Sequence, residues 1–158
     1  MTATAQILSK EELLKHWQGH RNLTRRVIEI FPEKDFFEFS IGGMRPFVQL
    51  ILELLAIGGP GVRSIAEKSI VELDEEAFKP TTKADVLKKW DEETEIINQY
   101  YNAIPEERFH ENFNLFGQFD FPVYENIFYF VDNEIHHRGQ AYVYLRALNI
   151  EPPFFWER

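Results

Sequence analysis

The chain contains no cysteine. This absence excludes disulfide bonds, zinc–thiolate centres and a cysteine nucleophile. Any metal that the protein binds must therefore be held by nitrogen and oxygen atoms, such as those of imidazole, carboxylate and amide groups.

Long apolar runs and an excess of basic residues are also missing. No stretch approaches the ~18 consecutive apolar residues of a membrane-spanning helix, and the start Met1–Ala5 has no basic segment followed by an apolar run. We therefore expect a cytoplasmic protein that does not insert into a membrane. Only 17 basic residues oppose 26 acidic ones, which gives a formal net charge of -9. Because this charge repels phosphate backbones, nucleic acid is not an expected partner.

Aromatic residues, by contrast, are abundant. They make up 15% of the 158 residues, and 15 of them are Phe. So much apolar surface in an acidic chain indicates a large core or a subunit interface. The length is typical of one domain. We predict a single domain over residues 9–158, preceded by a flexible tail over residues 1–8.

Two helices are predicted in the first half of the chain from apolar residues spaced by three and four. The first begins directly after Ser9, which is placed to form a capping box with Glu12 three positions later. It stops at Pro32. The second covers residues 46–57 and is apolar on almost every side, which is typical of a helix in an interior. The glycines and proline of residues 58–61 are expected to end it sharply.

Two more helices are predicted in the second half. Thr82 and Asp85 have the spacing of another capping box, and the helix that follows them stops at Pro105. The last and longest helix is predicted over residues 122–148, with Asp120 as its N-cap. These signals together predict an all-α fold, a four-helix bundle.

The segments between the helices differ in length. Residues 32–43 are expected to be a loop, and residues 62–73 a short helix within a longer link. That link exceeds what a tight helix–helix turn needs, so it can return the chain along the bundle and leave helices 2 and 3 parallel, as in bundles with one long crossover. The segment Glu106–Phe121, with its five Phe residues, is expected to fold over one end of the bundle as a wall or lid.

The last helix carries most of the polar groups that could do chemistry. At about 100° per residue, Asn133, His137, Gln140 and Tyr144 share one side, whereas His136 points away from it. Asn133 and His137 stand one turn apart, a spacing that allows two side chains of one helix to reach a single metal ion. Without further evidence, a histidine on such a face is more often a hydrogen-bonded core residue.

Glu53 is the informative residue of the second helix, because an ionised carboxylate in an apolar interior needs a partner. An ion pair with Arg138, Arg45 or a lysine, a hydrogen bond from a tyrosine, and a metal ion are the alternatives. Elsewhere, His20 is expected in the core and His110 in an exposed loop, and the charged face of the third helix, which includes Glu93, is expected to be solvated.

The chain resembles the DinB superfamily of damage-inducible, bacillithiol-transferase-like four-helix bundles. The most specific likeness is the string of residues 133–140, Asn-Glu-Ile-His-His-Arg-Gly-Gln, and the entry to the second helix at residues 44–46, Met-Arg-Pro, agrees with it. The resemblance implies a divalent metal bound by one histidine of the second helix and a His-x-x-x-His pair of the fourth. His137 matches the second histidine of the pair. Asn133 and Glu53 stand where the other two histidines are expected.

These departures leave two interpretations. In the first, Glu53, Asn133 and His137 hold nickel, zinc, manganese or iron. Gln140, Tyr144 and His136 then support the ligands or contact the substrate, and the resemblance implies a hydrolase or a thiol transferase that acts on a small electrophilic molecule, with a thiol as a possible cosubstrate. In the second, the metal has been lost, Glu53 pairs with a protonated His137, and the bundle binds a ligand or a protein without catalysis. We favour the first, because three polar groups in an apolar core are costly without a function. By resemblance we also expect a homodimer.

Overall fold

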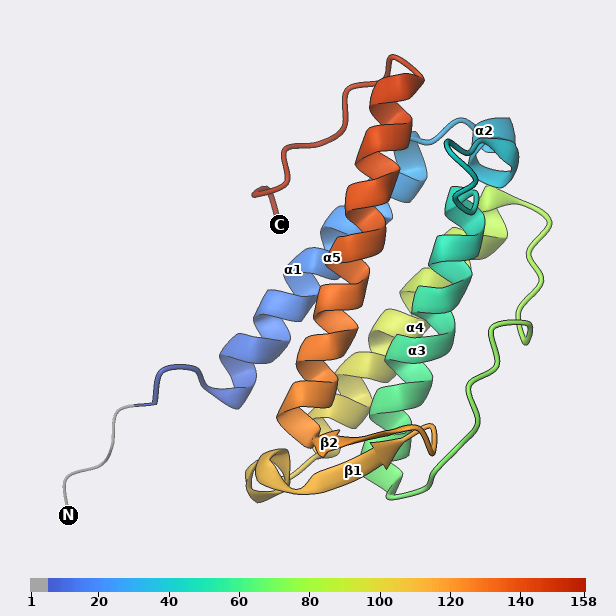
Figure 1. The fold of residues 1–158 in the computed structure, drawn as a ribbon. Coiled ribbons are helices and arrows are strands. Elements are labelled where there is room, and N and C mark those ends of the chain that lie inside the picture. Colours follow the sequence, from blue (N-terminus) through green and yellow to red (C-terminus); the bar gives the residue numbers. More distant parts are fainter. Residues whose placement is uncertain (1–5) are drawn as a thin grey trace.

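The computed structural model describes residues 6–158. It confirms the all-α four-helix bundle, built from four long helices of 21 to 25 residues (Figure 1). The elements in chain order are α1 (Lys10–Ile30), α2 (Glu33–Glu38), α3 (Phe47–Glu67), α4 (Lys83–Ala103), the 3-10 helix η1 (Glu106–His110), β1 (Asn112–Leu115), β2 (Phe119–Pro122) and α5 (Val123–Ala147). Residues 1–5 of the predicted tail lie outside the described part, and the domain limits stay a prediction.

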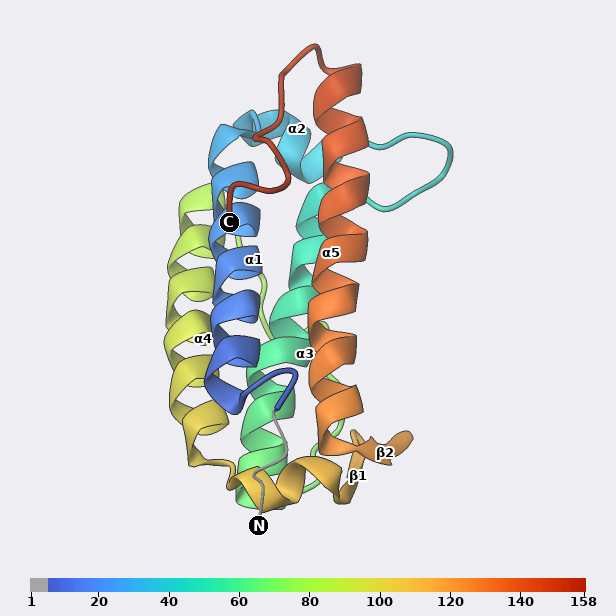
Figure 2. The ribbon, with the colours of Figure 1, turned by 90° about the vertical axis from the view of Figure 1, so that its left-hand side faces the viewer.

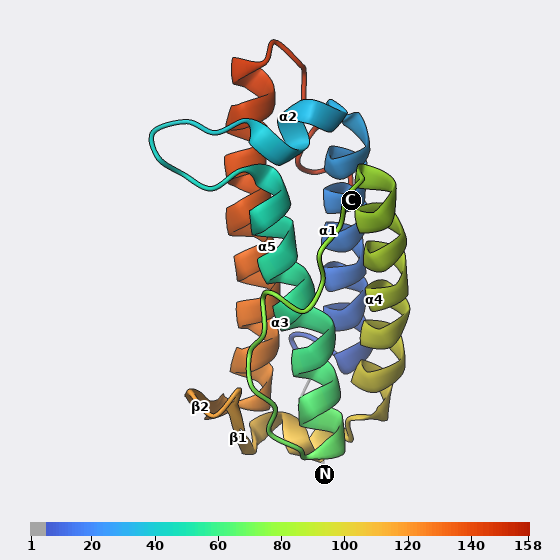
Figure 3. The same cartoon turned by 90° about the vertical axis from the view of Figure 1, so that its right-hand side faces the viewer.

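The four long helices are arranged with α1 and α5 running in one direction and α3 and α4 in the other (Figures 1 and 3). Helix α3 packs against α4 and α5, and α1 packs against the same two helices. The link from α3 to α4 returns along the length of the bundle, so the prediction of parallel second and third helices across a long crossover is confirmed (Figure 3).

The capping boxes at the starts of α1 and α4 are confirmed, because Ser9 and Thr82 each exchange hydrogen bonds with the residue three positions later. The predicted N-cap of the last helix is wrong. Asp120 lies in β2, opposite Asn114 of β1, and Pro122 is the residue that precedes the first turn of α5. The hairpin uses the backbone at Asp120 for strand pairing, so this residue cannot adopt the capping position.

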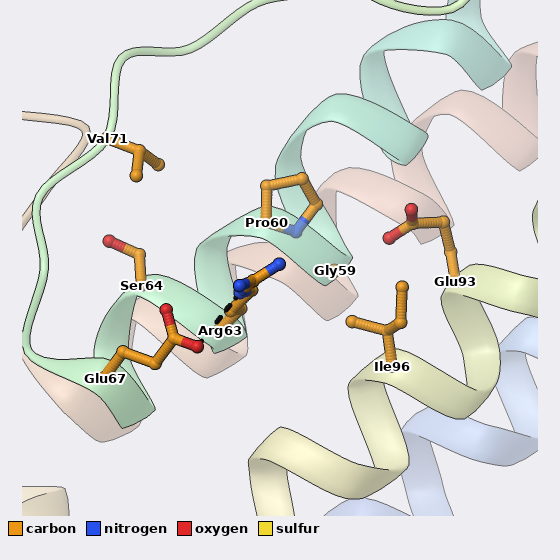
Figure 4. Close-up of a pocket in the computed structure, with 8 residues that line it drawn as sticks. All are labelled: Gly59, Pro60, Arg63, Ser64, Glu67, Val71, Glu93 and Ile96. Carbon is orange, nitrogen blue, oxygen red and sulfur yellow. Dashed lines mark hydrogen bonds and ion pairs between the residues drawn. The ribbon is translucent and has the colours of Figure 1, made fainter.

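The prediction that residues 58–61 end the second helix is also wrong, because α3 continues through Pro60 to Glu67. These glycines serve close packing instead of termination. A Cβ atom on Gly59 would overlap the carboxylate of Glu93 on α4 (Figure 4). A Cβ atom on Gly61 would lie 2.6 Å from the ring of Phe130 on α5. Glu93 itself is only 5% exposed, which corrects the expectation that it is solvated. Contacts with two neighbouring helices thus outweigh the hydrogen bond that Pro60 removes.

The connecting segments differ in part from expectation. Residues 33–38 form the short helix α2 rather than a loop, and Phe36 is buried within it. Residues 62–67 belong to α3, and no helix follows until α4. The Phe-rich segment forms η1 and the hairpin β1–β2, which close one end of the bundle as predicted (Figure 1).

Helix α3 is long and apolar enough to cross a membrane, judged by length and composition alone. In this structure, however, 67% of its most apolar window is buried among the other helices. Its apolar side chains, such as Leu50, Ile51 and Ile65, therefore supply the core of the bundle.

Candidate functional site

The three predicted ligands lie together between α3 and α5. His137 Nε2 is 3.0 Å from Glu53 Oε1, and Asn133 Nδ2 donates to the same oxygen over 3.2 Å. The side chains are largely shielded, with 7% exposure for His137 and 15% for Glu53. The packing of α3 against α5 thus joins residues that are 80 positions or more apart in the chain.

Gln140 orients the imidazole of His137 from one turn further along α5. Its Oε1 atom lies 2.8 Å from His137 Nδ1, and its Nε2 atom contacts the sulfur of Met44. An amide oxygen can only accept, so in this arrangement Nδ1 carries the hydrogen. In the neutral imidazole the Nε2 lone pair then faces the Glu53 carboxylate. Two acceptors at 3.0 Å need a proton or a cation between them.

Arg45 supplies a positive charge at the other oxygen of this carboxylate. Its Nη2 atom is 2.5 Å from Glu53 Oε2, and its Nη1 atom is 3.7 Å from Glu75 in the crossover. Burial alone raises the pKa of Glu53, but the hydrogen bond from Arg45, together with the one that His137 donates when its ring is protonated, outweighs it and the pKa is lowered overall. Glu53 is therefore ionised at neutral pH. Of the partners considered for this carboxylate, Arg45 and His137 are the ones present.

Tyr144 and His136, the other two residues predicted to support the site, make different contacts around it. Tyr144 donates from its hydroxyl to the backbone oxygen of Arg45 over 2.8 Å, so it holds the segment that carries the arginine. His136 is exposed and contacts the ring of His137, at a centroid distance of 5.0 Å, without reaching Glu53. Tyr144 thus has a positioning contact, and the supporting role of His136 stays a prediction.

The donor set fits a divalent metal in kind, because carboxylate, imidazole and amide groups all bind such ions. Within residues 6–158 no three His, Cys, Asp or Glu side chains are grouped as a metal site would require. Two strong donors, Glu53 and His137, are therefore complemented only by the amide of Asn133. Such a set would hold a metal less tightly than three histidines.

The proposed ion pair of Arg138 with Glu53 is wrong. Residues 137 and 138 are adjacent on α5 and point about 100° apart. The guanidinium of Arg138 therefore reaches α1, where it donates to His20 Nδ1 over 2.8 Å and to Thr24 Oγ1 over 3.0 Å. His20 is 5% exposed, as expected for a core residue, and His110 is exposed, as also expected.

This second polar cluster was not anticipated as a unit. Glu134 is 2% exposed, accepts from Thr24 over 2.7 Å and lies 3.8 Å from Arg21. Arg21 stacks on the ring of Trp90 and is also buried. The available signal was the spacing of Glu134 and Arg138, one turn apart on a face of α5 that is turned by roughly 100–140° from Asn133.

The main cavities within residues 6–158 do not include Glu53 or His137. One of about 290 Å³ lies beside Gly59 and Pro60 (Figure 4). Its charged groups are already paired, Arg63 with Glu67 and Glu93 with Lys89. The Glu53 site instead reaches solvent through Arg45, whose side chain is 42% exposed.

Comparison with known proteins agrees with the observed fold. Two solved structures have the same fold. A DinB-like protein of Bacillus cereus has a TM-score of 0.75 and 14% identity, over 92% of this chain and 97% of that one. A DinB-like protein of Bacillus subtilis has a TM-score of 0.73 and 19% identity, over 92% and 99%. No curated protein matches the sequence. The model of the DinB family matches residues 1–157, and the chain therefore belongs to the DinB family.

Proposed function

We propose that this protein is a metal-dependent enzyme of the DinB type in which Glu53, Asn133 and His137 hold a divalent ion. The family supplies the reaction class, which is hydrolysis or thiol transfer on a small electrophilic molecule, with a thiol as cosubstrate in the second case. A bound metal of this kind lowers the pKa of a coordinated water or thiol and so provides a nucleophile at neutral pH. Nickel, zinc, manganese and iron all suit nitrogen and oxygen donors.

The observation that supports this proposal is the contact of His137 Nε2 with Glu53 Oε1 at 3.0 Å. Gln140 accepts from Nδ1 of the same ring, as partners of metal-binding histidines commonly do, and this leaves the Nε2 lone pair directed at the carboxylate. A lone pair and an anionic oxygen that converge in a shielded site form an arrangement that a cation stabilises.

The other residues of the site have separate roles in this proposal. Gln140 keeps the imidazole in one tautomer, and Asn133 holds the carboxylate oxygen over 3.2 Å. Arg45, at the solvent side, neutralises the second oxygen of Glu53 and is placed to contact an anionic part of a substrate. Tyr144 keeps the Arg45 backbone in position.

A second candidate function rests on a different contact. Arg45 Nη2 lies 2.5 Å from Glu53 Oε2, so the carboxylate already has a positive partner without a metal. In this alternative a proton is shared between His137 and Glu53, and the bundle binds a ligand or a protein partner without metal chemistry. The first candidate predicts bound metal, which Arg45→Ala should bind more tightly. The second predicts no bound metal in either the native protein or the Arg45 variant.

The deciding experiment measures the metal content of protein purified without chelators, followed by calorimetric titration with Ni²⁺, Zn²⁺ and Mn²⁺. We expect stoichiometric binding that His137→Ala and Glu53→Gln abolish while helical content is retained. His136→Ala is the matched control, because it removes the adjacent exposed imidazole and should leave binding unchanged.

Arg45→Ala separates the alternatives further. If Arg45 competes with the ion for Glu53, its removal should tighten metal binding by about tenfold or less, the range of one exposed charge interaction. Absence of metal in all five proteins, the native one and the four variants, with no binding on titration, would contradict the metal proposal and leave the metal-free bundle.

A further inference from the structure

A second site is built on the opposite side of α5, independently of the Glu53 site. A cavity of about 410 Å³ opens between α1, α5 and the C-terminal segment. Figure 2 shows this segment returning from the end of α5 over α1. The polar lining residues used below are His20, Arg138, Tyr142 and Arg158, and the apolar ones are Ile135 and Phe155.

The hydrogen bonds of His20 leave the cavity with an excess of donors. Arg138 can only donate, so His20 Nδ1, 2.8 Å from its Nη2, is an acceptor. Burial, with Arg138 nearby, lowers the pKa of His20 to about 3, and the neutral ring therefore carries its hydrogen on Nε2. His20 Nε2 can donate this hydrogen to His16 Nε2, which lies 3.2 Å away. Arg158 Nη1, also 3.2 Å from His20 Nε2, then meets a donor instead of an acceptor.

Two more groups lack acceptors within residues 6–158. The hydroxyl of Tyr142 is buried and has no hydrogen-bond partner there. Arg138 uses Nη1 for His20 O and Thr24 Oγ1 and one hydrogen of Nη2 for His20, so its Nε hydrogen, which is not among the buried unsatisfied atoms of residues 6–158, is left for solvent or a ligand. Arg138 is 4% exposed, so these groups are shielded from bulk water. Unsatisfied buried donors are costly unless a ligand completes them.

The charges around the cavity are also unbalanced. Glu134 is the buried anion beside Arg138. Arg21 also lies near Glu134, but it has Glu93 and Asp91 nearby as well. Arg158 adds a positive charge at the mouth, and the nearest further acids are engaged elsewhere or exposed: Glu157 pairs with Arg26, and Asp132 lies in solvent beside His16. Two arginines, Arg138 and Arg158, thus line one cavity of a protein whose net charge is -9.

We propose that this cavity binds a small organic carboxylate, with its head group on Arg138, Tyr142 and Arg158 and its apolar body against Ile135 and Phe155. The planar guanidinium matches a carboxylate, which accepts two hydrogen bonds at once and carries the compensating charge. The volume of about 410 Å³ lies within the range of small-molecule pockets. This site is separate from the Glu53 site and does not depend on the function proposed for it.

The test is calorimetric titration of the full chain with phenylacetate, which has a carboxylate head and an apolar body. We expect saturable binding, with 2-phenylethanol, the neutral analogue, not binding, and inorganic phosphate, which lacks the apolar body, binding more weakly. Arg158→Gln removes an exposed charge at the mouth and should weaken phenylacetate binding about tenfold, a typical effect of one charged hydrogen bond, without changing the melting temperature.

Two further variants test a second proposed contact and control for the loss of charge. Tyr142→Phe removes the unpaired hydroxyl, so it should weaken binding several-fold while the melting temperature stays equal or rises. Arg146→Gln, on an exposed part of the same helix, is the matched charge control and should bind as the native protein does. No saturable binding at millimolar phenylacetate, equal binding by the Arg158→Gln and native proteins, or equal losses in Arg158→Gln and Arg146→Gln would each overturn the proposal.

Discussion

At the scale of single residues, two polar clusters occupy opposite faces of α5. His137 faces α3 and the carboxylate of Glu53, whereas Arg138, the next residue, faces α1 and the imidazole of His20. Both histidines are buried, but their neighbours differ in charge. His137 lies beside an anion, and His20 lies beside a cation that opposes its protonation.

His20 therefore makes stability depend on pH. Its pKa falls from 6.5 to about 3 in the folded protein because of burial and the nearby Arg138. The unfolded chain binds this proton more readily, so the contribution of His20 to stability is fully present above pH ~6.5 and is lost as pH falls towards about 3. We expect His20→Asn, which retains an acceptor for Arg138, to flatten the decline in unfolding free energy between pH 7 and 4.5, measured by urea denaturation.

The control for this prediction is His136→Asn, at the exposed neighbour of His137. Its unfolding free energy should fall with pH as steeply as that of the native protein. A His20→Asn curve parallel to the native one over the same range would show that another group is responsible.

The residues of the Glu53 site were predicted to different degrees. Asn133, His137 and Gln140 share one side of a regular helix, so their spacing alone placed them together. That Glu53 would meet them came from the resemblance to the DinB superfamily, because the unpaired carboxylate in an apolar helix indicated only that some partner was needed. Arg45 was only one of several possible partners, because it precedes α3 in an irregular segment whose path depends on the contact of Tyr144 with its backbone.

At the scale of elements, the helix starts are controlled locally. Thr82 accepts from the backbone of Asp85, and Asp85 accepts from the backbone of Thr82. We expect Thr82→Ala to lower the unfolding free energy by about 1 kcal/mol. Thr82→Ser keeps the hydroxyl and should recover most of the loss in the same chemical denaturation series. If Thr82→Ser is as destabilised as Thr82→Ala, the cap is not the cause.

The middle of α3 is controlled by its neighbours. A Cβ on Gly59 would overlap the carboxylate of Glu93, which must then turn away from its buried position beside Lys89, so we expect Gly59→Ala to destabilise the fold by about 1 kcal/mol. A Cβ on Gly58 would meet Ile97 and Trp17 at 3.5 and 3.6 Å, which are ordinary contacts. Gly58→Ala should therefore be neutral or stabilise the helix by up to about 1 kcal/mol. Thermal and urea unfolding of the two adjacent variants provide the comparison, and similar values would contradict the packing explanation.

At the scale of the whole molecule, apolar side chains remain exposed on α5 and the C-terminal segment. Val143 is 55% exposed, Phe155 67% and Trp156 59%. Burying such side chains favours association, and we predict a homodimer in solution. Light scattering should give the mass of two chains. Val143→Glu should shift the protein towards the monomer if α5 forms the interface, whereas Ile70→Glu in the crossover should not. A monomeric native protein at micromolar concentration would contradict this prediction.

The sequence by itself determined the elements that depend on near neighbours. Capping boxes, apolar periodicity and the long link between α3 and α4 specified four helices and a parallel middle pair, since each signal acts within a few residues. The sequence could not determine the length of α3, because the tendency of Gly58–Gly61 to end a helix is overridden by contacts with α4 and α5. Only the tertiary structure decided that Arg45 pairs with Glu53 and Arg138 with His20, because the energy of a buried charge depends on groups that are distant in the chain.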